Sequence, residues 1–273
     1  MNNKINDISL IFSENPIARA YLYLFLNENL ISNKIIYLDR KIIFNSFFMK
    51  LKFDTTFHNT KRYLRSENVL KFIKIIEKYF KLNDNFLIEM YNFENIFKFK
   101  NINFAKSIDI NNNNNIEFFK DLDDKNFLNT SNKILKNILN LKKNFYHIHP
   151  GYLYQVRGAD GALNSIKYFN EIGASFFLMD KKIDTGKIII RFKQKFNKLF
   201  FPNNNQFNSY DLYQIWYSFF DPALRVSLLK KMIDENINLN NFEVIDLKSK
   251  NNNYYSFIEK KEIKRLFNEK IFI

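Results

Sequence analysis

Two histidines and one aspartate stand out in this chain because they lie at or within the short segment that contains every glycine. His147 and His149 are two of the three histidines, and Asp184 follows His149 by 35 residues. Imidazole and carboxylate side chains are the groups that most often move protons in acid–base catalysis. We therefore expect the working chemistry of the protein between residues 147 and 186.

The distribution of glycine supports the same window. The five glycines are Gly151, Gly158, Gly161, Gly173 and Gly186. The abundance of Asn, Ile, Lys, Phe and Tyr indicates an AT-rich coding sequence, which should remove glycine codons. Retention of glycine in one window predicts backbone geometry that other residues cannot supply. A set of tight turns is the plainer interpretation of the same residues.

A metal site is the first alternative for the two histidines. Side chains two residues apart on a strand face the same side, which would suit shared coordination. No third ligand of obvious spacing accompanies His147 and His149, and the chain has no cysteine. We therefore predict no metal site, no disulfide and no cysteine nucleophile.

The motifs in this window resemble those of the folate-dependent formyltransferases. They are His147-Ile148-His149-Pro150-Gly151, then Arg157-Gly158, then Ile183-Asp184-Thr185-Gly186. The family has Asn-x-His-Pro at a strand end, an Arg-Gly pair shortly after it and Asp-Thr-Gly further along. The resemblance is best over about residues 127–192, and it leaves roughly the last eighty residues uncovered.

The resemblance implies an enzyme that transfers a formyl group from formyl-tetrahydrofolate to an amine. His149 and Asp184 match the catalytic histidine and aspartate of the family. His149 would then stabilise the oxyanion of a tetrahedral intermediate, and Asp184 would take the proton of the amine. The resemblance also implies folate contacts for Gly151, Asp184, Thr185 and Gly186, and acceptor contacts for Arg157 and Gly158.

Two positions depart from the family pattern. His147 replaces the Asn that helps to hold the formyl oxygen, and Tyr154 replaces a proline of the following loop. Histidine can also donate a hydrogen bond, so we expect His147 to assist His149 as a catalytic residue. The alternative is a non-catalytic folate-binding module on the same scaffold.

The acceptor has several candidates. Members of the family act on amino sugars attached to nucleotides, on aminoacyl-tRNA and on purine precursors, and some relatives hydrolyse the formyl-folate. No separate Arg-rich tRNA-binding domain is evident, so an amino sugar or another small amine is preferred to tRNA. Methionyl-tRNA formyltransferase-like activity and formyl-folate hydrolysis stay open, and the sequence leaves the oligomeric state undetermined.

The protein is basic, with a net charge of +14. Such a charge raises nucleic acid as a partner, and an RNA-binding module is a further alternative. However, the 42 basic residues comprise 34 Lys and only 8 Arg, the residue on which nucleic-acid sites rely. Solvated lysines are the preferred interpretation. No signal peptide or membrane-spanning run is apparent, so a cytoplasmic protein without a membrane partner is expected.

The elements that position these residues alternate between strand and helix. Strands are predicted at residues 9–12, 35–38, 86–90, 102–105, 127–128 and 145–148, with helices at 16–26, 69–80 and 134–139. Alternation of this kind predicts a formyltransferase-type, Rossmann-like α/β fold with a mostly parallel sheet and helices on both faces. His147 and His149 would then lie at a strand's carboxyl end, where such sheets bind ligands.

A smaller C-terminal α+β extension is predicted after the main domain. The catalytic domain is assigned to residues 1–202 and the extension to residues 203–273, with a soft boundary. Helices are expected from 209 to 220, from 222 to 233 and from 260 to 267, and strands at 242–245 and 254–258. Asp221 and Pro222 cap and start a helix, and Trp216 is expected in the core.

Overall fold

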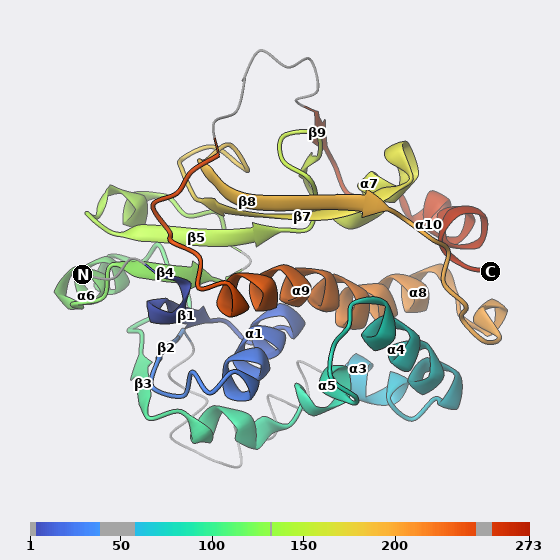
Figure 1. Ribbon diagram of the computed structural model, residues 1–273, viewed down its shortest axis with the longest axis horizontal. Helices are drawn as coiled ribbons and strands as arrows, with labels where there is room; N and C mark the ends of the chain where they lie inside the picture. Colours follow the sequence, from blue (N-terminus) through green and yellow to red (C-terminus); the bar gives the residue numbers. More distant parts are fainter. Residues whose placement is uncertain (1–3, 39–57, 132, 244–252) are drawn as a thin grey trace.

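A seven-stranded sheet forms the centre of the molecule (Figure 1). The computed structural model describes residues 4–38, 58–131, 133–243 and 253–273. The strands are β1 (Ser9–Phe12), β2 (Lys34–Tyr37), β3 (Asn101–Phe104), β4 (Asn126–Asn129), β5 (Asn144–His149), β7 (Glu171–Leu178) and β8 (Ile188–Lys195). Their order is β3-β2-β1-β4-β5-β7-β8; β7 pairs antiparallel with both β5 and β8, and the other neighbouring strands pair parallel. The prediction of a mostly parallel α/β sheet is confirmed.

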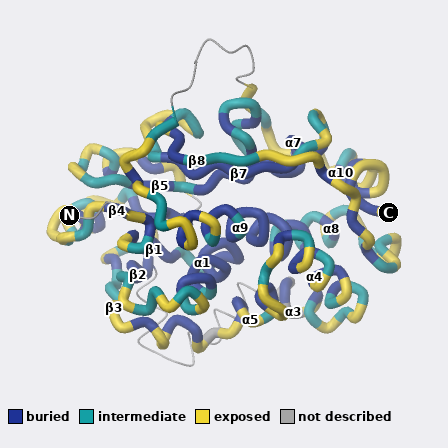
Figure 2. Tube along the Cα trace, viewed as in Figure 1, coloured by how far each residue is buried: buried dark blue, intermediate teal, exposed yellow. Residues whose placement is uncertain are grey.

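Helices cover both faces of this sheet. Leu10 and Phe12 of β1 share a core cluster with α1 (Pro16–Asn27) and α9 (Asp221–Asp234). Ile11, which points the other way, belongs to a second cluster with Phe119 of α6 (Asn113–Asp121). Strands buried on both faces need a continuous apolar run instead of an alternating one, as β1 has. The tube in Figure 2 is accordingly dark blue along β1, α1 and α9.

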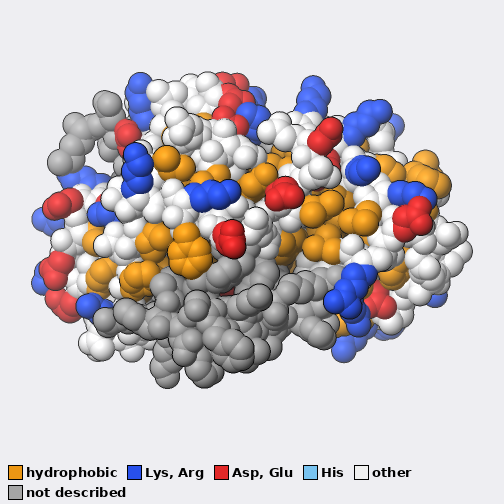
Figure 3. Space-filling model, turned by 90° about the horizontal axis from the view of Figure 1, so that it is seen from below, with side chains coloured by type: hydrophobic (Ala, Val, Ile, Leu, Met, Phe, Trp, Pro, Cys, Tyr) orange, Lys and Arg blue, Asp and Glu red, His pale blue; other side chains and the backbone are white. Residues whose placement is uncertain are grey.

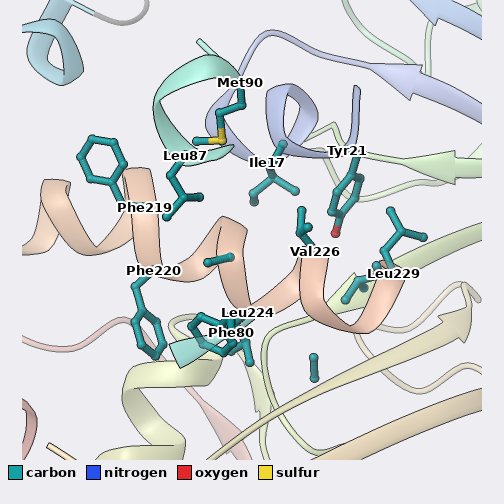
Figure 4. Packing of buried hydrophobic residues seen from close by; sticks show 14 of the residues in the cluster. Ile17, Tyr21, Phe80, Leu87, Met90, Phe219, Phe220, Leu224, Val226 and Leu229 are labelled. Carbon is teal, nitrogen blue, oxygen red and sulfur yellow. The ribbon is translucent and has the colours of Figure 1, made fainter. Parts of the chain in front are cut away.

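Helix α9 packs directly on helix α1. Figure 4 shows Ile17 and Tyr21 of α1 facing Val226 and Leu229 of α9. All four side chains are buried, and they belong to the cluster that contains the N-terminal strands. The domain boundary near residue 203 stays a prediction, but residues 221–234 share the core of the sheet.

The remaining α-helices and strands flank the sheet. They are α3 (His58–Tyr63), α4 (Glu67–Tyr79), α5 (Phe86–Glu89), α7 (Gly161–Phe169), α8 (Ser209–Ile215), α10 (Lys260–Leu266), and the two-residue strands β6 (Arg157–Gly158) and β9 (Tyr254–Tyr255). Strand β9 pairs parallel with β6, so the C-terminal segment lies beside the Arg-Gly motif.

The turn from β1 into α1 forms as the sequence predicts. Asn15 is the N-cap, because its Oδ1 accepts the N–H of Ala18 at 2.9 Å, and Pro16 occupies the first helical position. The amide nitrogen of Asn15 also donates to the carbonyl of Thr130 at 2.8 Å. This side chain therefore fixes the start of α1 against the end of β4.

The strand predicted at residues 86–90 is wrong, because Phe86–Glu89 form the short helix α5. The carboxylate of Glu77 accepts the N–H groups of Asn85 and Leu87 at 3.2 and 2.8 Å. Asn85 has the left-handed φ of 63° that turns the chain into the helix. A carboxylate from a neighbouring helix thus overrides the β-propensity of the apolar run.

The helix predicted at residues 134–139 is also wrong. Only a 3-10 turn, Asn137–Asn140, forms there. The side chain of Asn111 accepts the N–H of Lys136 at 2.8 Å and donates to the carbonyl of Ile134 at 2.9 Å. These bonds occupy backbone groups that a helix would need.

The break predicted at Asp221-Pro222 does not occur. A π turn at Trp216–Phe220 joins α8 to α9 without interruption. The wider turn shifts the hydrogen-bond register, so the missing N–H of Pro222 and its ring are tolerated. Further on, only Tyr254–Tyr255 of the strand predicted at 254–258 forms, and the strand predicted at 242–245 lies partly outside the described residues.

Substitution of Leu229 by Ala should destabilise the whole domain, because this side chain is fully buried between α9 and the core. The expected loss in the free energy of unfolding is about 2–5 kcal/mol. Lys231→Ala on the same helix is the control, since its side chain is 54% exposed. It should change stability by less than about 0.5 kcal/mol. Urea unfolding followed by circular dichroism measures both, and equal effects would show that α9 is not part of this core.

Candidate active site

The site lies at the carboxyl ends of β4 and β5. The chain order of the sheet reverses between β1 and β4, and open α/β sheets bind ligands at such a point. Thr130 and Ser131 directly follow β4, while His149 is the last residue of β5. The strands therefore deliver polar side chains to the edge where a ligand is expected.

His149 and Asp184 lie close together, as the motif spacing predicts. Nδ1 of His149 is 3.5 Å from Oδ2 of Asp184, and the same oxygen accepts the N–H of Gly158 at 2.9 Å. A Cβ on Gly151 or on Gly161 would come within 2.9 Å of Nε2 of His149. The two glycines therefore make room for a buried imidazole.

Gly158 has a second reason to be glycine. Its φ is +90°, and a Cβ there would come within 2.2 Å of the carbonyl oxygen of Tyr255. The N–H that Gly158 donates to Asp184 depends on this backbone conformation. The Arg-Gly motif thus positions the carboxylate of Asp184 from the backbone.

The loop that carries Asp184 is held from two sides. The hydroxyl of Tyr154 donates to the carbonyls of Thr185 and Gly186 at 3.2 and 2.9 Å. Nη2 of Arg157 donates to the carbonyl of Ile183 at 2.9 Å. Tyr154, which replaces the family's proline, therefore braces the Asp-Thr-Gly motif.

His147 has both ring nitrogens engaged. Nδ1 lies 3.1 Å from the carbonyl oxygen of Asn129, and Nε2 lies 3.3 Å from Nη1 of Arg225. A carbonyl can only accept and a guanidinium can only donate, so Nδ1 carries the proton and Nε2 accepts. Burial, followed by the positive charge of Arg225, lowers the pKa of His147 to about 4.

Arg225 is a functional candidate that sequence reasoning did not assign. It comes from α9, is only 7% exposed, and donates from Nε to Asp221 at 2.9 Å and from Nη1 to the carbonyl of Ile148. The sequence contained a signal, because arginine is nearly as rare in this lysine-rich chain as glycine. Asp221 and Pro222 were interpreted as a helix cap, and Arg225 was therefore not assigned a function.

The pKa values of the pair favour a neutral imidazole beside a carboxylate. Burial lowers the pKa of His149, although the charge of Asp184 opposes this. Burial would raise the pKa of Asp184, but His149 and the N–H of Gly158 outweigh it, so the pKa falls below its usual range. At neutral pH Asp184 is therefore a proton acceptor.

Two cavities meet at this cluster, with volumes of about 270 and 250 Å³. The walls of both include His147, Asp184, Tyr217 and Arg225. The first extends along the end of β4 and the segment after it, and the second lies over the start of α7 and against α8. Because the two cavities share the wall that contains His147 and Asp184, they can hold two reactants beside the same acid–base groups.

The predicted site residues divide into two groups. His147 and Asp184 line both cavities, and His149 and Gly158 line the second. The other four, Gly151, Arg157, Thr185 and Gly186, line neither cavity in the described part of the chain. The functional assignments of all of them stay predictions.

Across residues 4–38, 58–131, 133–243 and 253–273, no three His, Asp or Glu side chains converge as a metal site would require. Within the same ranges no helix combines the length and the apolar character needed to cross a bilayer.

The chain was compared with known proteins. No protein-family model matches it, and no curated protein is similar to it in sequence. Among solved structures, a 4-N formyltransferase from Francisella tularensis is 21% identical, and 92% of this chain matches 77% of that one at a TM-score of 0.49.

Two other solved structures are similar to the chain. An N-formyltransferase from Helicobacter canadensis, solved with folinic acid and dTDP-3-aminofucose, is 19% identical over 91% of this chain and 71% of its own, at a TM-score of 0.45. A methionyl-tRNA formyltransferase from Clostridium thermocellum is 14% identical over 72% of this chain and 71% of its own, at a TM-score of 0.37. The similar structures thus include enzymes of the family that the motifs resemble.

The neutral state of His147 makes stability sensitive to acid. An unfolded histidine binds a proton below about pH 6.5, whereas the native ring stays neutral down to a pKa of about 4. Unfolding therefore takes up a proton in this window, and the free energy of unfolding falls by up to about 1.4 kcal/mol per pH unit as the pH decreases. The His147→Asn variant should lose the part of this pH dependence of the free energy of unfolding that His147 contributes.

Urea unfolding at several pH values between 7.5 and 4.5 measures the effect. Lys231→Ala should follow the wild-type slope, because its side chain is exposed and lines neither cavity. Parallel curves for the wild type and His147→Asn would contradict a neutral His147.

Proposed function

We propose that this protein transfers a formyl group from formyl-tetrahydrofolate to the amine of a small acceptor. The observation that carries the proposal is the pair of cavities that meet at His147 and Asp184. Group transfer between two molecules needs both to reach one proton acceptor at the same time. A depressed pKa keeps Asp184 ionised for this role.

The first cavity fits the folate donor. Leu135, Phe177 and Met179 supply apolar walls, while Asn129 and Thr130 supply polar groups at one edge. A flat heterocycle with hydrogen-bonding edges needs this combination. Two lysines, Lys133 and Lys182, also line the cavity and suit the carboxylates of the folate tail.

The second cavity fits the acceptor. Tyr213, Trp216 and Tyr217 line it with aromatic surface, which packs well against the apolar face of a sugar or a base. His149 lies in this cavity and Asp184 lies at the shared wall. An amino sugar placed here would have its amine within the compartment that holds both groups.

The protein's part in the reaction follows from these positions. The amine nitrogen attacks the formyl carbon, and the carbonyl oxygen takes the electron pair as an oxyanion. Asp184 accepts the proton that the attacking nitrogen loses. When the bond between carbon and the folate nitrogen breaks, Asp184 returns a proton to that nitrogen. The products are a formamide and tetrahydrofolate, and no redox partner is needed.

The alternatives differ in what occupies the second cavity. Formyl-folate hydrolysis would put water there, and a compartment of about 250 Å³ with aromatic walls favours an organic acceptor. On the face shown in Figure 3, Lys and Arg side chains are interspersed with Asp and Glu, which favours solvated charges over an RNA-binding surface. A cytoplasmic location stays a prediction.

Turnover of formyl-tetrahydrofolate, followed by absorbance with a panel of amines, tests the proposal. The wild type should turn over only with an acceptor present. Asp184→Asn removes the proton acceptor and should lower kcat by about 10²–10⁴-fold. Asp234→Asn is the matched control, because that carboxylate is 51% exposed on α9 and should leave kcat unchanged.

The other outcomes identify the alternatives. Turnover without any amine would indicate a hydrolase. Folate binding without turnover, measured by calorimetry across the same panel, would sink the catalytic proposal and favour a non-catalytic binding module.

A further inference from the structure

The hydrogen bonds of His147 leave it no proton to give to a substrate. Its Nδ1–H points to the carbonyl of Asn129 at 3.1 Å, and its Nε2 accepts from Arg225 at 3.3 Å. The Asn that the family has at this position carries two amide hydrogens and can donate to the formyl oxygen. In this chain the donor that replaces this Asn, beside His149, must come from another side chain.

We propose that Arg225 takes over this role and stabilises the oxyanion of the tetrahedral intermediate. The inference rests on the proposed formyl transfer. Arg225 lines both cavities, together with His147, Asp184 and Tyr217. The guanidinium therefore lies at the place where the formyl carbon must pass from one compartment to the other.

The environment of Arg225 suits a fixed positive charge. Its side chain is 9% exposed, and it pairs with Asp221, also 9% exposed, at 2.9 Å one helical turn away. Its Nη1 donates to the carbonyl of Ile148 at the end of β5. A guanidinium held on three sides cannot turn away when charge develops, and a site shielded from water strengthens its effect.

Asp221 is a positioning residue in this arrangement. It takes the Nε–H of Arg225, which leaves Nη1 to face β5 and the ring of His147. His147 is then also a positioning residue, because its unprotonated Nε2 holds the guanidinium at the wall of the cavities. The two features are connected, because His147 can accept from Arg225 and the buried Arg225 supplies the donor that His147 lacks.

The protonation of His147 can be measured without any substrate. Two-bond ¹H–¹⁵N correlation spectra of the full chain should show a neutral His147 ring with its proton on Nδ1 between pH 5.5 and 8. The spectrum of His147→Asn assigns the signal, which is feasible because the chain has only three histidines. A proton on Nε2 would give His147 its own donor and would overturn the proposal.

Kinetics of the double variant Arg225→Met/Asp221→Leu test the role in catalysis. Both charges are removed so that no carboxylate is left buried without its partner. With an amine that the wild type uses, kcat should fall by about 10²–10³-fold while KM for both substrates changes by only a few fold. A purely structural role would instead raise KM or lower the folded fraction. Arg265→Met is the control, since that guanidinium is 66% exposed and pairs with Glu269 at the same i,i+4 spacing.

The possible results test the role of Arg225 separately from the proposed formyl transfer. A wild type that turns over while the folded double variant keeps its kcat within about tenfold would overturn the role of Arg225. A wild type without turnover on any amine would instead remove the proposed function. If the double variant fails to fold, Arg225→Lys decides, because a point charge without the planar fork should still lose kcat and leave KM little changed.

Discussion

The structure depends on one constraint, which is that ionisable groups buried at the ends of β4 and β5 must satisfy one another. A charge left buried there without a partner would cost several kcal/mol. Arg225 is paired with Asp221 at 2.9 Å, and Asp184 accepts the N–H of Gly158 at 2.9 Å. Three features meet this need for partners. The glycines allow close approach to His149 and Asp184, α9 brings Arg225 and Asp221 to the strand ends, and the imidazoles stay neutral.

The central elements could be predicted because they are specified locally. The run from Ser9 to Phe12 is apolar enough to be buried on both faces, and Asn15-Pro16 is a helix start in any context. The His149 and Asp184 pair could also be predicted, but from the motif resemblance and the clustered glycines. Periodicity alone would not have brought two residues 35 positions apart to 3.5 Å.

The wrong predictions arose where a side chain from a neighbouring element overrode a local preference. Glu77 turns residues 86–89 into a helix, and Asn111 prevents one at residues 134–139. Each acts through hydrogen bonds to backbone groups that a sequence pattern does not report. The same limit explains why Arg225 was not assigned, because its partners His147 and Ile148 are more than seventy residues away in the chain.

The charges at the junction also bear on the kind of acceptor. With His147 and His149 neutral, the junction holds the guanidinium of Arg225 and the carboxylates of Asp221 and Asp184. One carboxylate is matched by the guanidinium, whereas Asp184 accepts the N–H of Gly158 and faces Nδ1 of His149. An ammonium group entering the second cavity would be attracted to this surplus carboxylate, but the acceptor must attack as the free amine, and Asp184 would take the proton only from the nitrogen that the attack has made acidic. The same carboxylate would repel an anion, so this unbalanced charge supports the proposal of an amine acceptor.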